Sequence, residues 1–129
     1  MAKVLKELQF ETPNKTGVLG KVSDALKKAG VNMEQAWACG EGSRGHFGIV
    51  TNNNAKAKKA LQKIGVRKFS EKEVLMVAVP NRVGALSRIA GKLAKAHIAV
   101  TCLSATSAGK NRVAVLLGTK NNKKARRVI

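Results

Sequence analysis

Two short turns in this 129-residue chain carry side chains able to hold a small polar ligand. In each turn an asparagine stands three residues before a glycine, as Asn14 before Gly17 and Asn81 before Gly84. An asparagine amide can donate to a carboxylate and accept from an ammonium group. Glycine has no Cβ, so a ligand can come close to the backbone there. One such turn alone is more typical of a capped helix. Its repetition strengthens the case for binding, although common descent would also preserve a structural turn.

A predicted helix follows each turn and adds backbone donors at the same place. After the first turn, Leu19, Val22, Leu26 and Ala29 recur at helical spacing, and Gly30 is a suitable stop. The first N–H groups of a helix have no intrahelical partner, and the helix dipole makes that end partly positive. A carboxylate binds there without further groups. The predicted ligand contacts are Asn14, Lys15, Thr16, Gly17, Val18 and Leu19 in the first copy, and Asn81, Val83, Gly84, Ala85 and Leu86 in the second.

The two turns belong to a repeat of the whole unit, at the constant offset that carries Pro13 onto Pro80. No gap is needed between Leu8 and Thr51, and chance would give only about two or three identities over that span. The identical pairs include Leu8 with Leu75, Leu26 with Leu93, Ala38 with Ala105 and Gly42 with Gly109.

The side chain of Thr16 or Asn14 could cap the first helix.

The pattern of each copy predicts strand, helix, strand, strand, helix, strand. In the first copy the strands are expected at 4–10, 31–39, 46–51 and 66–69, with the second helix at 55–64 and Ile64 facing inward. The second copy has strands at 74–79, 98–105 and 112–117 and lacks its last strand. We therefore expect an α+β fold of two ferredoxin-like βαββαβ units in tandem, as domains 1–70 and 71–129. The strand at 74–79 is apolar on both faces, and an uncovered sheet edge needs a partner, so both features favour an oligomer.

The residues that follow each loop carry a family resemblance. The pattern Asn-x-x-Gly-x-Leu before an amphipathic helix, with Gly30-Val31-Asn32-Met33 or His97-Ile98-Ala99-Val100 at the next strand, resembles the ACT domain. The resemblance covers nearly the whole chain. It implies small ferredoxin-like modules, many of which bind amino acids and regulate a linked enzyme. The stretch Gly84-Ala85-Leu86-Ser87-Arg88 is also similar to regulatory subunits of acetolactate synthase.

The same resemblance implies a ligand set that differs between the copies. In serine-binding members the ligand lies at an interface between two domains, held by a loop asparagine and by an asparagine at the start of the second strand. The loop asparagine matches Asn14 and Asn81, and the second matches Asn32, whereas the second copy has Ala99. The first copy is therefore expected to bind more fully, and the second to form the interface that closes the pocket. The family's frequent proline before the loop glycine is Thr16 or Val83 here.

The favoured function is a non-catalytic regulatory sensor of a small or apolar amino acid. Neither loop holds an acidic residue, and Glu11 is the nearest, so a basic ligand is disfavoured. Met33 and Trp37 are interpreted mainly as core side chains, with a pocket wall as the alternative role. Cys39 and Cys102 lack metal-site spacing, and no catalytic set, metal ligand or cofactor motif is found. Two alternatives stay open: a regulatory subunit docking on a biosynthetic enzyme such as an acetolactate synthase, and a basic nucleic-acid-binding protein.

The charge is the support for the nucleic-acid alternative. Lys and Arg number 25 against 7 Asp and Glu, a net charge of +18. The basic residues are spread over every predicted element, without interleaved aromatic side chains for stacking bases. Nucleic acid is therefore a less favoured partner than a free amino acid, an enzyme or a second copy of the chain in a homodimer or higher oligomer. The two cysteines and the absence of a long apolar run favour a cytoplasmic protein and no membrane partner.

Overall fold

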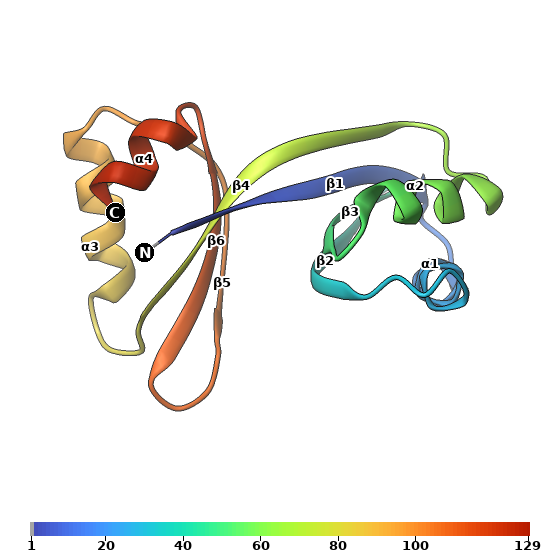
Figure 1. The fold of residues 1–129 in the computed structure, drawn as a ribbon, viewed down its shortest axis with the longest axis horizontal. Coiled ribbons are helices and arrows are strands. Elements are labelled where there is room, and N and C mark those ends of the chain that lie inside the picture. Colours follow the sequence, from blue (N-terminus) through green and yellow to red (C-terminus); the bar gives the residue numbers. More distant parts are fainter. Residues whose placement is uncertain (1) are drawn as a thin grey trace. The chain divides into compact units, whose positions relative to one another are not determined.

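The computed structural model describes residues 2–129, and its elements follow the predicted order (Figure 1). The first copy supplies β1 (Lys3–Pro13), α1 (Val18–Lys28), β2 (Met33–Glu41), β3 (Arg44–Thr51) and α2 (Asn54–Lys63). The second supplies α3 (Ala85–Lys95), β5 (Val100–Ser107), β6 (Arg112–Thr119) and α4 (Asn122–Val128). Between them runs β4 (Phe69–Pro80). The structure therefore has one strand, β4, where separate strands at 66–69 and 74–79 were expected, and the strand at 66–69 was wrong because residues 66–68 precede β4.

The chain divides into two compact units, but not at the expected boundary. Lys6–Lys72 forms the N-terminal unit, and Glu73–Ile129 forms the C-terminal unit together with residues 2–5. The division lies inside β4, two residues beyond the expected limit at residue 70. The grouping of residues 2–5 with the second half was not anticipated. Both β1 and β4 therefore contribute residues to both units.

The N-terminal unit is a sheet in the order β2-β3-β1-β4 with α1 and α2 on one face. Both β1 and β2 pair with β3 in antiparallel fashion, with Leu8 opposite Ile49 and Ala36 also opposite Ile49. Alternate strand residues face the helices, as the period of two requires. Phe10 and Phe47 stack with ring centroids 5.0 Å apart. The core is formed by Leu8, Phe10, Val22, Leu26, Val31, Phe47, Ile49, Ala57, Ala60, Leu61 and Val66.

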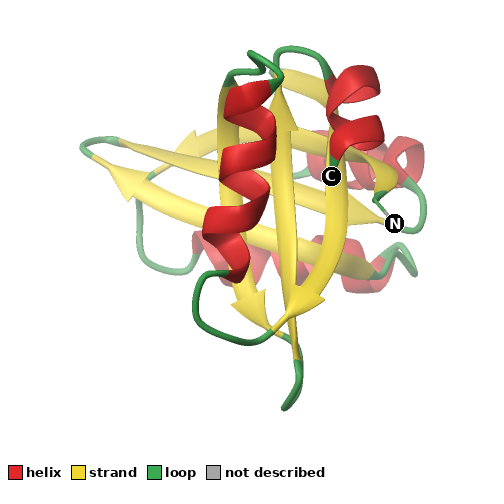
Figure 2. Cartoon of the chain, turned by 90° about the vertical axis from the view of Figure 1, so that its left-hand side faces the viewer, coloured by secondary structure: helices red, strands yellow, loops and turns green. Residues whose placement is uncertain are grey.

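The C-terminal unit repeats this arrangement, with α3 and α4 covering one face of its strands (Figure 2). Its order is β5-β6-β4-β1, so the start of β1 lies where a fourth strand of the second copy would be. Ala2 is buried in the same core as Leu75 and Leu117, and Arg126 Nε donates to the Ala2 carbonyl oxygen over 3.1 Å. The open edge that favoured an oligomer in the sequence is thus covered by the chain itself.

The gap-free repeat register ends at the second hairpin. Ala38 lies opposite Phe47 in the first copy. At the constant offset their counterparts are Ala105 and Ala114, but Ala105 lies opposite Val115, one position further along. The loop joining β5 and β6 therefore contains one additional residue. The expectation of an unbroken offset to Thr51 was wrong beyond this point.

The shifted register shows a repeated asparagine turn that the sequence comparison missed. In the first copy the Asn53 side chain accepts from the Lys56 N–H as the α2 cap, over 3.1 Å. Asn54 Oδ1 accepts from Thr51 Oγ1 over 2.6 Å, and Asn54 Nδ2 donates to the Lys6 carbonyl oxygen over 3.0 Å. The same bonds recur in the second copy among Thr119, Asn121, Asn122, Lys124 and Glu73. These turns fix the second helix of each unit to a strand.

Several finer expectations concern helix ends. Gly30 follows α1 with φ of 70°, so it is a left-handed stop as predicted. Ile64 does not face inward: it follows α2 and is 44% exposed, so that prediction was wrong. His97 occupies in the second copy the place of Gly30 and has φ of 56°. A side chain with Cβ is strained in this conformation.

The two helix ends predict opposite effects of substitution on stability. Gly30→Ala should lower the free energy of unfolding by about 1 kcal/mol, and His97→Gly should raise it by about 0.5–1 kcal/mol. Gly20→Ala is the matched control, because Gly20 lies inside α1 with open space where a Cβ would be added, and alanine there should stabilise by about 0.5–1 kcal/mol. Urea denaturation measures all three. Destabilisation by His97→Gly would show that the imidazole contributes more than its backbone strain costs.

Candidate functional site

The loop before each first helix is shaped by its glycine. Gly17 has φ of 88° at the N-cap of α1, and Gly84 has φ of 84° at the N-cap of α3. Neither helix has a side-chain cap, so the expected capping by Thr16 or Asn14 was wrong. The left-handed glycine turns the chain into the helix instead, and its carbonyl accepts the first intrahelical bond, from Lys21 N in the first copy over 3.0 Å. Glycine is thus required here by conformation.

Asn14 ties this loop to the hairpin between β2 and β3. Its Nδ2 donates to the Gly42 carbonyl oxygen over 2.9 Å, and its backbone N–H donates to the Ser43 carbonyl oxygen over 2.9 Å. The amide lies directly over Gly40, where a Cβ would come within 2.6 Å of Asn14 Oδ1. Among the described residues no protein group donates to Oδ1. The oxygen is therefore available as an acceptor for a ligand ammonium group.

In the second copy a serine stands between the corresponding groups. Ser107 occupies the position of Gly40, and Asn81 Nδ2 donates to its Oγ over 3.4 Å. The hydroxyl in turn donates to the carbonyl oxygen of Gly109, the counterpart of Gly42, over 3.2 Å. The direct bond of the first copy has become a relay through a hydroxyl. The second loop is thus tethered by a longer and weaker contact.

A cavity of about 170 Å³ opens beside the first loop. Its lining joins the loop and the start of α1 to β2 and β3, and no acidic side chain contributes to it. The first turn of α1 also contains no acidic residue, so the helix dipole there is uncompensated. Of the predicted contacts, Thr16 and Gly17 belong to the loop without lining the cavity. The lining residues are Thr12, Pro13, Asn14, Lys15, Val18, Leu19, Ala38, Cys39, Gly40, Gly45 and Phe47.

Asn32 lies away from this cavity. It precedes β2, where its N–H donates to Asn52 Oδ1 over 3.0 Å and its carbonyl accepts from the Asn52 N–H. Gly40, beside Asn14, is eight residues further along the strand, or about 26 Å at the usual rise. One N-terminal unit therefore cannot hold a small ligand with both Asn14 and Asn32. Contacts from both side chains require two copies of the unit.

The second loop borders a cavity of about 160 Å³ with a different character. Of the predicted contacts only Ala85 lines it, and Arg82, Arg88 and Lys92 supply three cations. Asn81, Val83, Gly84 and Leu86 lie outside it. Val83 is fully exposed and Leu86 is 42% exposed, so the second loop presents apolar side chains to its surroundings. The two loops share a backbone and differ in the side chains that they offer.

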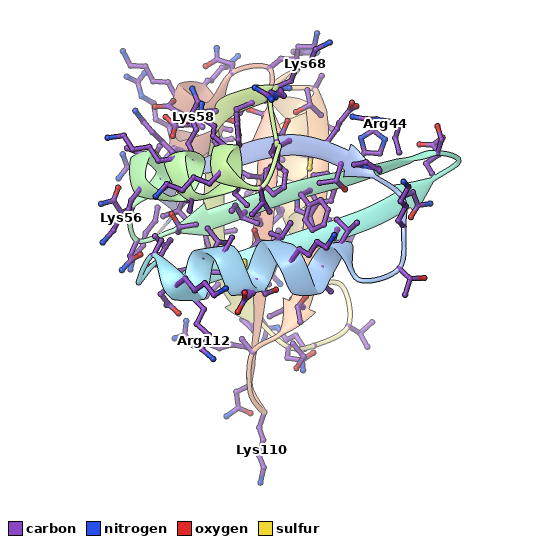
Figure 3. The ribbon with its side chains drawn as sticks, turned by 90° about the vertical axis from the view of Figure 1, so that its right-hand side faces the viewer. Arg44, Lys56, Lys58, Lys68, Lys110 and Arg112 are labelled. Carbon is purple, nitrogen blue, oxygen red and sulfur yellow. The ribbon has the colours of Figure 1, made fainter. Side chains whose placement is uncertain are left out.

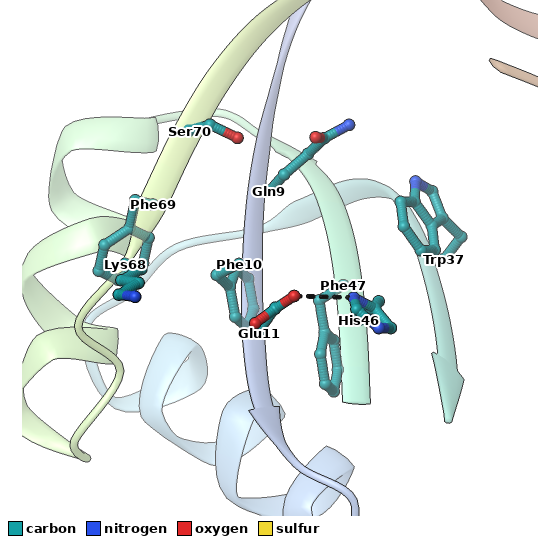
Figure 4. A pocket seen from close by; sticks show the side chains of 9 residues that line it. All are labelled: Gln9, Phe10, Glu11, Trp37, His46, Phe47, Lys68, Phe69 and Ser70. Atoms are coloured by element: carbon teal, nitrogen blue, oxygen red, sulfur yellow. Dashed lines mark ion pairs between the residues drawn. The ribbon is translucent and has the colours of Figure 1, made fainter. Parts of the chain in front are cut away.

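Sequence reasoning missed a second polar arrangement, on the sheet face away from α1 and α2 (Figure 4). Trp37 was interpreted as a core residue, but it lies across Gly48, and its Nε1 donates to Glu7 Oε2 over 3.2 Å. Glu7 is fully buried and also accepts from Gln9 Nε2 over 2.7 Å. Met33, in contrast, packs against the core as expected. A glycine within the strand predicted at 46–51 was the available signal, since such a glycine often marks close approach of another group.

This face also contains a cavity of about 350 Å³. Glu11 pairs there with His46, whose Nδ1 is 3.3 Å from Oε1 (Figure 4). Glu11 also pairs with Arg44 over 3.4 Å. In the described part of the chain no group of three His, Cys, Asp or Glu side chains could hold a metal ion. The arrangement offers hydrogen bonds and ion pairs.

A family model described as an ACT domain pair matches residues 3–129. The chain belongs to the ACT domain pair family. A solved protein from Bacteroides thetaiotaomicron is 25% identical, with a TM-score of 0.87 over 98% of this chain and 87% of that chain. The regulatory subunit of aspartate kinase from Thermus thermophilus is 15% identical, with a TM-score of 0.71 over 98% of this chain and 93% of that one. The aspartokinase alpha and beta subunits give 20% identity, a TM-score of 0.71 and the same coverage.

These comparisons establish the tandem ACT fold that the loop pattern predicted. The aspartate kinase structures share the fold of this ACT pair, and the one from Thermus thermophilus is described as a regulatory subunit. No curated protein matches the chain. Among the described residues, no helix is both long and apolar enough to span a membrane.

The contrast between Gly40 and Ser107 predicts how the first loop responds to substitution. Gly40→Ala should displace the Asn14 amide and lower the free energy of unfolding by about 1 kcal/mol, the usual value of one hydrogen bond. Gly40→Ser should cost less, because its hydroxyl can form the relay seen in the second copy. Urea denaturation measures both effects. Equal losses for the two variants would show that steric displacement, and not the hydrogen bond, sets the stability of the loop.

Proposed function

We propose that this ACT pair is a non-catalytic sensor that binds a small or apolar amino acid at the loop before α1. The carrying observation is the cavity of about 170 Å³ that joins the Asn14 loop to the N-terminal end of α1. This place offers an anion the partial positive charge of the helix end and the nearby Lys15 ammonium. The regulatory role is supported by the family and by the fold shared with aspartate kinase regulatory subunits.

The groups around the cavity match the two charges of an amino acid. The α-carboxylate would accept from the first-turn N–H groups of α1, and the α-ammonium would donate to Asn14 Oδ1. Val18, Ala38 and Phe47 leave an apolar space of small volume for the side chain. A basic side chain would find no acidic partner in the lining. A small or apolar amino acid therefore suits this cavity best.

Asn14 and Asn32 of one chain are too far apart to contact one small ligand, so a ligand held by both asparagines would lie at an interface between two copies of the chain. Each could contribute to one ligand only if the Asn32 end of a second unit met the Asn14 end of the first. Leu19, at the start of α1, is 60% exposed and is available for such a contact. A ligand shared in this way would couple ligand binding to dimer formation. The sensor could then signal through its oligomeric state, without catalysing a reaction.

A regulatory subunit that docks on a biosynthetic enzyme is the second candidate, and it shares the same ligand site. The observation that favours it is the similarity to a protein described as the regulatory subunit of aspartate kinase, over 93% of that chain. The two candidates differ in what receives the signal. Sedimentation of the protein alone, with and without ligand, distinguishes self-association from docking.

The first test is a screen of the common amino acids, one at a time, by thermal shift and calorimetry. A ligand at about a hundred times its dissociation constant should add about 2.7 kcal/mol to the stability of the folded state. We expect small or apolar amino acids to stabilise the protein and lysine and arginine to have no effect. If no amino acid changes the melting temperature or gives heat on titration, the sensor proposal fails.

The second test compares matched variants of the two loops. Asn14→Ala should lower the affinity for the ligand found in the screen by about tenfold or more, because a hydrogen bond to a charged group is lost. Asn81→Ala is the control at the equivalent position and should change the affinity less than about twofold. Titration calorimetry measures both. Unchanged affinity in Asn14→Ala would place the ligand elsewhere, and a larger loss in Asn81→Ala would assign it to the second loop.

A further inference from the structure

A groove between α1 and α2 has an apolar floor, with a row of lysines on its α2 side and one lysine on its α1 side. It has a volume of about 380 Å³ and lies in the N-terminal unit. Its α1 side lies towards the C-terminal end of that helix, whereas the amino-acid cavity lies at the N-terminal end. We call it the lysine groove. Its lining residues are Ala25, Lys28, Ala29, Lys56, Lys59, Ala60, Lys63 and Ile64.

The lysines of α2 are not neutralised within the protein. Lys56, Lys59 and Lys63 take part in none of the ion pairs found among the described residues, and no acidic residue lines the groove. Only Lys28 on the opposite side has a partner, Asp24, at 3.0 Å. The three lysines of α2 that line the groove are spaced i, i+3 and i+7, so they form one row about 10 Å long on one helix face. Figure 3 views this unit from the side of the two helices, with Lys56 at the surface of α2.

The floor of the groove is aliphatic. Ala25 and Ala29 come from the α1 side and Ala60 from α2, while Ile64 is 44% exposed at the end of α2. Small side chains between two helices let apolar groups of another molecule come close to the helix backbones. Burial of the exposed Ile64 side chain by a partner would remove apolar surface from water and favour binding. A partner that only neutralised the lysines would leave this floor in contact with water.

The corresponding surface of the second copy carries different side chains. Lys92 stands where the first copy has Ala25, so the apolar floor is interrupted. Lys124, the counterpart of Lys56, donates from Nζ to the Ala96 carbonyl oxygen over 2.9 Å. One cation is therefore engaged and another lies on the floor. The combination of an alanine floor with unpaired lysines is therefore specific to the side chains of the first copy.

We infer that the lysine groove is a docking surface for an acidic amphipathic helix of a partner protein. Such a helix presents apolar side chains at i, i+3, i+4 and i+7, with Asp or Glu beside them. The apolar stripe would cover the alanines and Ile64, and its carboxylates would meet the row of lysines. A single-stranded nucleic acid would supply the charge, but its bases commonly stack on aromatic side chains, and none lines this groove.

The experiment uses the full chain and a fluorescein-labelled synthetic helix of about five turns, with leucines on one stripe and glutamates beside them. Fluorescence anisotropy is measured at about 0.15 M salt, where attraction between exposed charges more than about 8 Å apart is largely screened and direct contacts persist. The comparison probes are a peptide of the same composition with shuffled order and a single-stranded oligonucleotide. We expect the striped peptide to bind about tenfold more tightly than the shuffled one.

Variants assign the binding to the groove. Replacing Lys56, Lys59 and Lys63 together by Gln should lower the affinity for the striped peptide by about tenfold. The matched control removes the same charge from Lys72, Lys95 and Lys110, which are exposed and lie outside the groove, and should change binding less than about twofold. Ile64→Ser should lower the affinity for the striped peptide by about fivefold and leave the affinity for the shuffled peptide unchanged.

Three results would overturn the inference: equal loss in the two lysine variants, equal binding of the striped and shuffled peptides, or tighter binding of the oligonucleotide through the groove lysines. The last would identify the groove as a nucleic-acid surface. Circular dichroism melts of each variant confirm that the exposed substitutions leave the fold intact. Asn14→Ala should bind the striped peptide normally, so failure of this inference and failure of the amino-acid site are separate outcomes.

Discussion

The left-handed conformation of Gly17 and Gly84 sets the direction in which α1 and α3 leave their strands. With this conformation fixed, Val22 and Leu26 or Ile89 and Leu93 meet the sheet, and the cores close beneath the helices. The same turn leaves the helix N-terminus without a side-chain cap. A conformational requirement of the backbone and a place for an anion thus arise from one residue, which explains why the loop can serve folding and binding together.

Duplication kept the backbone and allowed the side chains to diverge. The loop glycines, the asparagine turns before α2 and α4, and the helix-covered cores are the same in both copies. The differences gather at single positions: Gly40 against Ser107 beneath the loop asparagine, Gly30 against His97 at the helix stop, and Ala25 against Lys92 on the helix surface. Each substitution changes what one copy presents while the fold of its unit is retained.

The fold could be predicted from sequence because its signals are local and repeated. Helix stripes and the glycine stop each depend on near neighbours, and two copies at a constant offset confirm one another. The failures involve long-range information. Residues 2–5 join the C-terminal unit through contacts with the opposite half of the chain, and the one-residue insertion in the second hairpin is visible only once strand partners are known. Within the candidate site, the position of the loop before α1 was predictable, but the separation of Asn14 from Asn32 follows from the length of β2. Trp37 was misplaced because its type indicates burial and cannot distinguish the two faces of a sheet.

The sharing of β1 has a consequence for the order of folding. Residues at the start of this strand are synthesised well before Glu73, yet their contacts lie in the C-terminal unit, and the bond from Arg126 to Ala2 spans 124 positions. During synthesis the N-terminal unit can form its core before the strand partners of residues 2–5 have been made. Contacts of such sequence separation slow folding, because the entropy of loop closure must be lost before they form. The two units are alike in structure, but they differ in when they can fold during synthesis. The N-terminal unit forms from one continuous stretch of sequence. The C-terminal unit is complete only when its residues contact the start of the chain.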